Sequence, residues 1–148
     1  MKRVLTLFLG LFAFVGIATA DEAEADSCLR QKIWDGYNDG WAVRTATSAT
    51  LSQGDYRIYL VTLYAGNEYK VLACGDDQSK VVDLVLHDSN GNVVVEEKCA
   101  DGDAECGGRQ PVITYKPTTT DTFYIAVHAT SLTDTTAKAG VGMAVTYK

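Results

Sequence analysis

The sequence predicts an all-β protein, an antiparallel jelly-roll-like β-sandwich of about seven or eight strands with a short N-terminal helix. From residue 56 to the end of the chain, apolar and polar side chains alternate in short runs, and turns rich in Gly, Asn, Asp and Ser separate these runs. Most neighbouring runs have no helical pattern between them. Because parallel strands need crossover connections that are usually helical, this spacing favours two stacked antiparallel sheets.

The strand pattern is clearest over residues 56–95. In residues 81–88 one row of side chains is apolar and predicts the inward face; its members are Val82, Leu84 and Leu86. The Asn-Gly pair at residues 90–91 lies between two apolar runs, which is the strongest short signal for a β-hairpin. Residues 56–63 are largely apolar or aromatic in both alternating rows, which predicts a central strand covered on both faces.

The N-terminus has the pattern of a secretory signal peptide. Lys2 and Arg3 form a positive head, residues 4–17 are almost entirely apolar, and the small residues 18–20 form a cleavage site. We therefore expect a mature chain that begins at Asp21 and is periplasmic or secreted. The apolar run is short for a membrane span and no Cys stands at the cleavage site, so no membrane anchor is expected. The predicted organisation is a signal peptide over 1–20, an N-terminal segment with a helix and a linker over 21–50, and a β-sandwich domain over 51–148.

The expected mature chain is acidic. The whole sequence carries 13 Lys and Arg residues against 19 Asp and Glu residues, a formal charge of −6. Removal of residues 1–20 takes away two basic residues and no acidic one, which leaves 11 against 19 and a formal charge of −8. Because the basic residues are scattered singly rather than clustered, nucleic acid and anionic membrane surfaces are not expected partners.

The four cysteines predict two disulfide bonds, because an exported chain folds in an oxidising compartment. Three connectivities are open. We favour Cys28–Cys74, which ties the N-terminal segment to the sheet, and Cys99–Cys106, which closes a polar loop between strands. A zinc site would need two close pairs of ligands, which the spacing of these cysteines does not supply.

Residues 27–41 predict a short amphipathic helix with Asp26 or Ser27 as its N-cap. Apolar side chains recur there at four-residue steps, at Leu29, Ile33, Tyr37 and Trp41. Trp34 and Trp41 allow two interpretations: they seal one end of the sandwich core, or they form a platform on which a sugar ring stacks. Residues 45–52 predict an extended segment or a linker.

Four segments of the chain occur in an order that resembles a known family. They are AGNEYKVLACGD, DLVLHDSNGNVV, PVITYKPTTTDTFYIAV and AGVGMAVTY, and they lie within residues 56–147. This succession resembles the bacterial pre-peptidase C-terminal (PPC) domains. The resemblance implies a jelly-roll β-sandwich of the kind appended to secreted proteases, where it aids secretion, localisation or polymer binding and in some members binds calcium.

Calcium is the metal that this resemblance implies, although no cofactor is required. The candidate oxygen ligands are Asp76, Asp77, Asp83, Asp88 and Asn90. The loop that starts at Asp88 is not an EF-hand, because Val93 stands where such a loop needs Gly and Cys99 stands where it needs Glu. The alternative is a plain hairpin turn, in which Asn and Asp serve because they tolerate left-handed backbone.

No sequence motif predicts catalysis, since the chain lacks a nucleophile elbow, a zinc-protease helix motif and a phosphate-binding Gly-rich loop. His87 and His128 each lie in a predicted strand and would share one surface if these strands were neighbours. We expect a non-catalytic binding or accessory module whose ligand, a polysaccharide or a protein surface, contacts Trp34, Trp41 and His87. The alternative is a small periplasmic inhibitor or partner protein that acts through the Cys-bounded loop over residues 99–106.

Overall fold

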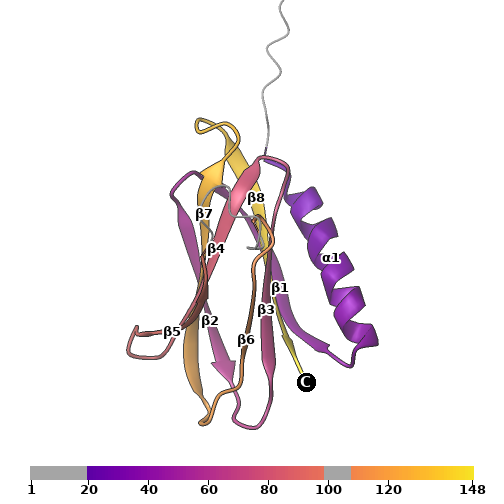
Figure 1. Cartoon of the computed structure of the whole chain (residues 1–148), viewed down its shortest axis with the longest axis vertical. Helices are drawn as coiled ribbons and strands as arrows, with labels where there is room; N and C mark the ends of the chain where they lie inside the picture. The colour runs from indigo at the N-terminus through magenta and orange to yellow at the C-terminus, as the bar shows by residue number, and fades with distance from the viewer. Residues whose placement is uncertain (1–19, 99–107) are drawn as a thin grey trace, which may run out of the picture.

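A computed structural model describes residues 20–98 and 108–148 of the protein (Figure 1). One helix and eight strands follow one another along these residues. Their bounds are α1 Glu22–Asn38, β1 Ala42–Ser52, β2 Tyr56–Leu63, β3 Tyr69–Gly75, β4 Ser79–His87, β5 Val93–Glu97, β6 Val112–Tyr115, β7 Asp121–Leu132 and β8 Lys138–Tyr147.

The strands of the described residues form two antiparallel four-stranded sheets. One sheet has the order β1-β8-β3-β6 and the other the order β2-β7-β4-β5. This interleaved order is that of a jelly roll, so the predicted fold class is confirmed. Figure 1 shows the two sheets face to face, with α1 lying along the outside of the first sheet.

The core fills the space between the two sheets. The predicted inward row of β4 is confirmed, because Val82, Leu84 and Leu86 are fully buried. They pack in one cluster with inward residues of the other sheet, such as Val71 of β3 and Val145 of β8. Burial of each such side chain stabilises the fold by about 1.5–3 kcal/mol relative to leaving it in water.

Helix α1 begins at Glu22, five residues before the predicted start at residue 27. Asp21 caps it, since its Oδ1 accepts a hydrogen bond from Glu24 N at 3.0 Å. The acidic side chains of Glu22 and Glu24 in the first turn favour the positive end of the helix dipole. No helix in the described part of the chain is long and apolar enough to cross a membrane.

A disulfide joins α1 to the sheet beneath it. Cys28 of α1 is bonded to Cys74 of β3, with their Cα atoms 6.1 Å apart, which confirms the predicted long bridge. Beside it, Leu29 packs with Leu72 and Ala144 in a small second core between helix and sheet. The predicted bridge Cys99–Cys106 lies outside the described residues.

Two glycines of β8 let α1 approach the sheet closely. A Cβ atom at Gly142 would lie 2.5 Å from Leu29 Cδ1. A Cβ atom at Gly140 would lie 2.5 Å from the carbonyl carbon of Asp21 and 2.7 Å from Glu22 N. These distances are shorter than any ordinary contact. A side chain at Gly140 would displace the main chain at the start of the helix, whereas a side chain at Gly142 would push aside the Leu29 side chain.

Two strands differ from the sequence-based expectation. Of the two alternatives for residues 45–52, the extended segment is confirmed and the linker is wrong, because these residues belong to β1, which pairs with β8 along its length. The extended segment starts earlier than expected. The sandwich therefore begins at residue 42 rather than 51. The strand over residues 56–63 was expected at the centre of a sheet, but β2 is an edge strand whose pairing in the described residues is with β7 alone. Its outward residues Ile58 and Leu60 are 53% and 68% exposed.

Candidate functional site: a groove on the outer sheet face

The two outer faces of the sandwich differ in what covers them. Helix α1 packs against β1, β3 and β8 of one sheet, whereas no helix of the described residues covers the β2-β7-β4-β5 sheet (Figure 1). A groove of about 610 Å³ lies on this second face, within the range of ligand sites. We call it the outer-face groove. Its lining residues are Gly54, Tyr56, Ile58, Asp83, Val85, His87, Val93, Lys98, Ala126, His128 and Thr130.

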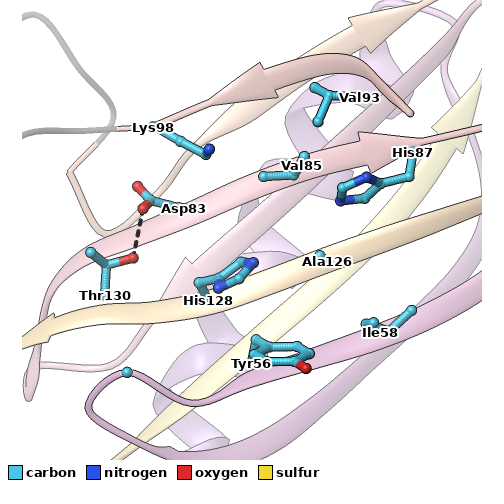
Figure 2. Close-up of a pocket in the computed structure, with 11 residues that line it drawn as sticks. Tyr56, Ile58, Asp83, Val85, His87, Val93, Lys98, Ala126, His128 and Thr130 are labelled. Atoms are coloured by element: carbon cyan, nitrogen blue, oxygen red, sulfur yellow. Dashed lines mark hydrogen bonds between the residues drawn. The ribbon is translucent and has the colours of Figure 1, made fainter. Parts of the chain in front are cut away.

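The outer-face groove has an apolar floor and an apolar rim. Val85 and Ala126 form the floor and are 2% and 3% exposed. Tyr56, Ile58 and Val93 flank this floor in Figure 2, and each is more than half exposed. Exposed apolar side chains gathered in a groove are typical of an interaction surface.

Polar side chains gather at one end of the groove. The Thr130 hydroxyl donates a hydrogen bond of 2.7 Å to Asp83 (Figure 2). The strand register places His128 opposite Asp83, and the His128 ring packs against Tyr56 with 5.1 Å between ring centroids. Lys98 reaches the same end from the residue after β5. A ligand on the apolar floor therefore meets a carboxylate, an ammonium, a hydroxyl and an imidazole at this end.

The imidazole of His128 is biased toward its neutral form. Burial lowers the pKa of His128 below its ordinary value, because the imidazolium loses hydration there. The Asp83 carboxylate opposes this effect, whereas the charges of Lys98 and His87 add to it. At neutral pH His128 thus offers one N–H donor and one acceptor nitrogen to a ligand.

Substitutions at the polar end should move the pKa of His128 in opposite directions. Asp83→Asn removes the stabilising anion and should lower the pKa further, whereas Lys98→Met removes a repelling cation and should raise it. An NMR titration of the ring Cε1–H signals measures both shifts, and His87→Gln assigns the signals because the chain has two histidines.

The same pKa shift has a consequence for stability. Since the folded-state pKa of His128 is depressed, the unfolded chain takes up the proton first as the pH falls below about 6.5. The folded state should lose stability as the pH falls from about 6.5 to the lower folded-state pKa of His128. His128→Gln should remove this part of the pH dependence. An unchanged pH profile in His128→Gln, or equal pKa values in the Asp83→Asn and Lys98→Met chains, would contradict this account of the polar end.

His87 lies in the outer-face groove, but at the end away from His128. Its Nδ1 is 3.2 Å from the carbonyl oxygen of Gly91 in the β4–β5 turn. β4 and β7 are neighbours, so the two histidines do share one surface. The register pairs His87 with Tyr124, four residues along β7 from His128, which is about 13 Å of strand. The two imidazoles therefore line the groove separately and do not form a pair.

The two tryptophans lie in different environments. Trp41 is 8% exposed, and Lys70 Nζ lies 4.2 Å from the centroid of its ring. Its ring lies beside the C-terminal part of α1, outside the cluster that fills the space between the two sheets, and it leaves no exposed platform. Trp34 is 64% exposed on α1 and stacks with Tyr37, which is equally exposed, at 6.2 Å and an interplanar angle of 23°.

The candidate calcium ligands do not converge on one point. Asp76 and Asp77 precede β4 while Asp88 and Asn90 follow it, and nine strand residues span about 30 Å. Asp83 lies between them on the outer face of the sheet. In the described residues, no group of three or more His, Cys, Asp or Glu side chains is placed to hold a metal ion.

Two of these candidate ligands, Asp88 and Asp76, already accept hydrogen bonds with their carboxylate oxygens. Asp88 Oδ1 accepts from Asn90 N and Asn92 N, both at 2.9 Å. The Asn92 N–H in particular lowers the pKa of Asp88. Asp76 is fully buried and accepts from main-chain N–H groups. The five residues thus fit a calcium site poorly, and the alternative of a plain turn explains the Asp88 loop.

Comparison with known proteins gives no family for this chain. No protein-family model matches the sequence, and no curated protein matches it. The likeness to PPC domains therefore stays a prediction drawn from the order of four segments, whereas the jelly-roll order of strands is a property of the structure.

Sequence reasoning found part of the groove and missed the rest. It named His87 as a ligand contact and Asp83 in another role, as a calcium ligand. It missed Tyr56, Ile58 and Lys98. The apolar outward row of β2 is visible in the sequence, but only the strand order places it on an edge strand with its side chains in water. A row of exposed apolar side chains there indicates a partner.

Proposed function

We propose that this protein is a non-catalytic binding module, periplasmic or secreted, that holds a segment of a partner protein in the outer-face groove. The observation that carries the proposal is the exposed apolar rim of the groove beside its polar end. The compartment is supported by the Cys28–Cys74 disulfide, which is typical of oxidising environments outside the cytoplasm.

The chemistry of the rim favours a protein partner over a sugar. Ile58 and Val93 are aliphatic, and aliphatic side chains pack well against the apolar side chains of another protein. Sugars bind better on flat aromatic rings, and of the exposed rim Tyr56 alone offers one. Leu60 continues the apolar row along β2 beyond the groove and is 68% exposed. The row lies on an edge strand, which is where an extended partner segment can add to a sheet.

The polar end of the groove gives such a segment a direction. Asp83 and Lys98 lie together there, so one charged or polar side chain of the partner meets a complementary group while its apolar side chains cover Val85 and Ala126.

Selection from a displayed library of random peptides against the mature chain tests this function. Peptides that bind should lose affinity about tenfold or more for Ile58→Ser, because burying one large apolar contact is worth about 1.5–3 kcal/mol. Ile58 is exposed, so its replacement should leave the melting temperature nearly unchanged. Trp34→Ala, on the opposite side of the molecule, is the matched control and should bind normally. Absence of enriched peptides, or binding that Ile58→Ser leaves intact, would refute the groove as a protein site.

A second function has an observation of its own, the stacked pair Trp34 and Tyr37. Their rings are nearly parallel and exposed on α1, as in a platform for sugar rings. Co-sedimentation with insoluble peptidoglycan, chitin and cellulose tests this second function. Here Trp34→Ala is the test variant and should lose binding to the polysaccharide, whereas Ile58→Ser is the control and should retain it. The alternative of an inhibitor that acts through residues 99–106 involves a loop outside the described residues.

A further inference from the structure

A buried carboxylate lies where the described chain begins. Asp76, in the turn between β3 and β4, has no exposed surface. Its Oδ2 accepts hydrogen bonds from Asp21 N at 2.8 Å and from Gly140 N at 2.7 Å. Its Oδ1 accepts from Gln78 N at 3.1 Å and from the Ser79 hydroxyl at 3.4 Å. All four donors are neutral as long as Asp21 is bonded to Ala20, because the nitrogen of Asp21 is then a peptide N–H.

No cation contacts this carboxylate within the described residues. Arg109 lies close by, but its Nη1 donates to the main-chain oxygen of Asp76 at 2.9 Å and lies 3.9 Å from Glu24 Oε1. Glu24 Oε2 in turn accepts from Asp77 N at 3.1 Å. A buried anion without a counter-ion is costly, because its hydration is lost and neutral hydrogen bonds replace only part of it.

The missing positive charge would appear if the chain were cut at the predicted signal-peptide site. Hydrolysis of the Ala20–Asp21 peptide bond adds water across it: Ala20 gains a carboxylate, and the nitrogen of Asp21 becomes an α-amino group that is protonated at neutral pH. That nitrogen already lies 2.8 Å from Asp76 Oδ2. Cleavage there would therefore turn a neutral hydrogen bond into a charge-assisted one between the same two atoms.

We infer that Asp76 is the receptor for the new N-terminus, and that the α-ammonium group of Asp21 pairs with the Asp76 carboxylate in the mature protein. Gly140 is part of this receptor, because a side chain there would collide with the main chain of Asp21. Other nearby charges are those of Glu22 and Glu24 on α1, Asp77 beside the receptor, Arg109 before β6 and Lys138 at the start of β8. The proposed ion pair between Asp21 and Asp76 does not involve the outer-face groove. An experiment can therefore refute one of the two proposals and leave the other intact.

The test compares chains that differ only in their first residue. One chain begins at Asp21 with a free α-amino group, a second begins at Ala20, and a third carries one further residue before Ala20. The Asp21 chain should melt about 5 °C higher at pH 6 than the other two, because charge-assisted hydrogen bonds are about twice as strong as neutral ones. The second and third chains should melt alike, since both carry a peptide N–H at Asp21.

The pH dependence of this difference identifies the group. An α-amino group paired with a carboxylate titrates above its ordinary value of about 8, so its stabilising effect is complete below that pH and is lost as the pH rises through the folded-state value. At pH 10 the advantage of the Asp21 chain should therefore shrink. Asp76→Asn should abolish the advantage at pH 6; if that variant does not fold, the comparison of the unsubstituted chains at the two pH values decides alone.

Mass spectrometry of the exported protein supplies the second measurement. A mature chain that starts at Asp21 supports the inference. Chains that melt within about 1 °C of one another at pH 6 would overturn it, as would an exported protein whose first residue is another one.

Discussion

A chain that carries both Cys28→Ala and Cys74→Ala is expected to lose about 4 kcal/mol of unfolding free energy. The disulfide spans 46 residues, and on the loop-entropy model its removal frees the unfolded chain by that amount. Cys74 is also fully buried, so the smaller side chain removes some packing between α1 and β3. The melting temperature should fall by roughly 15 °C, measured by circular dichroism with matched chemical denaturation.

The control for the disulfide is a substitution on the same helix that faces solvent. Gln31→Ala removes an exposed hydrogen bond to Asp35 and should change stability by less than about 0.5 kcal/mol. If the double alanine chain lost less than about 1 kcal/mol, the helix would be held by Leu29 and its neighbours without need of the bridge. Hydrogen exchange would then show α1 as protected in the double variant as in the parent.

Most of the sandwich was predictable because period-two burial is a local property. The inward row of β4 can be read directly, since Val82, Leu84 and Leu86 alternate with residues that point outward. The long disulfide was also predictable, because in an exported chain a cysteine near the N-terminus needs a partner in the body of the fold.

The role of β2 was not predictable from its own residues. A strand with apolar side chains in both alternating rows has the same sequence pattern in two cases: when both of its faces are buried, and when it lies at the edge of a sheet with one row exposed to water. Only the strand order separates these cases, and it puts β2 at the edge with Ile58 and Leu60 exposed. The β2 side of the outer-face groove was missed for this reason, because Tyr56 and Ile58 were assigned to the interior.

The start of α1 depends on contacts that are distant in sequence. Residues 22–26 precede the predicted helix, yet α1 includes them, because Asp21 N donates to the Asp76 carboxylate and Glu24 accepts from Asp77 N. Helix propensity alone does not contain these contacts. The polar sequence of this segment therefore gives no sign that it forms a helix end held by the turn between β3 and β4.

Gly140→Ala is expected to destabilise the protein by about 3 kcal/mol, the second-largest effect we predict. The added methyl group would lie 2.5 Å from the Asp21 carbonyl carbon and 2.7 Å from Glu22 N. Both are main-chain atoms, so no side-chain rotation relieves the overlap. The first turn of α1 must move away from β8, and the hydrogen bond from Asp21 N to Asp76 must lengthen. Chemical denaturation measures the loss.

Gly36→Ala is the matched control, because it makes the same chemical change within α1. Its added methyl group would lie 3.5 Å from Trp41 Cβ, an ordinary contact, and Ala favours a helix over Gly by about 1 kcal/mol. Gly36→Ala should therefore leave stability unchanged or raise it slightly. If both variants lost stability equally, general intolerance of Gly replacement would explain the result better than the contact between β8 and Asp21. Opposite signs would show that the space above Gly140 is what lets the helix begin at Glu22.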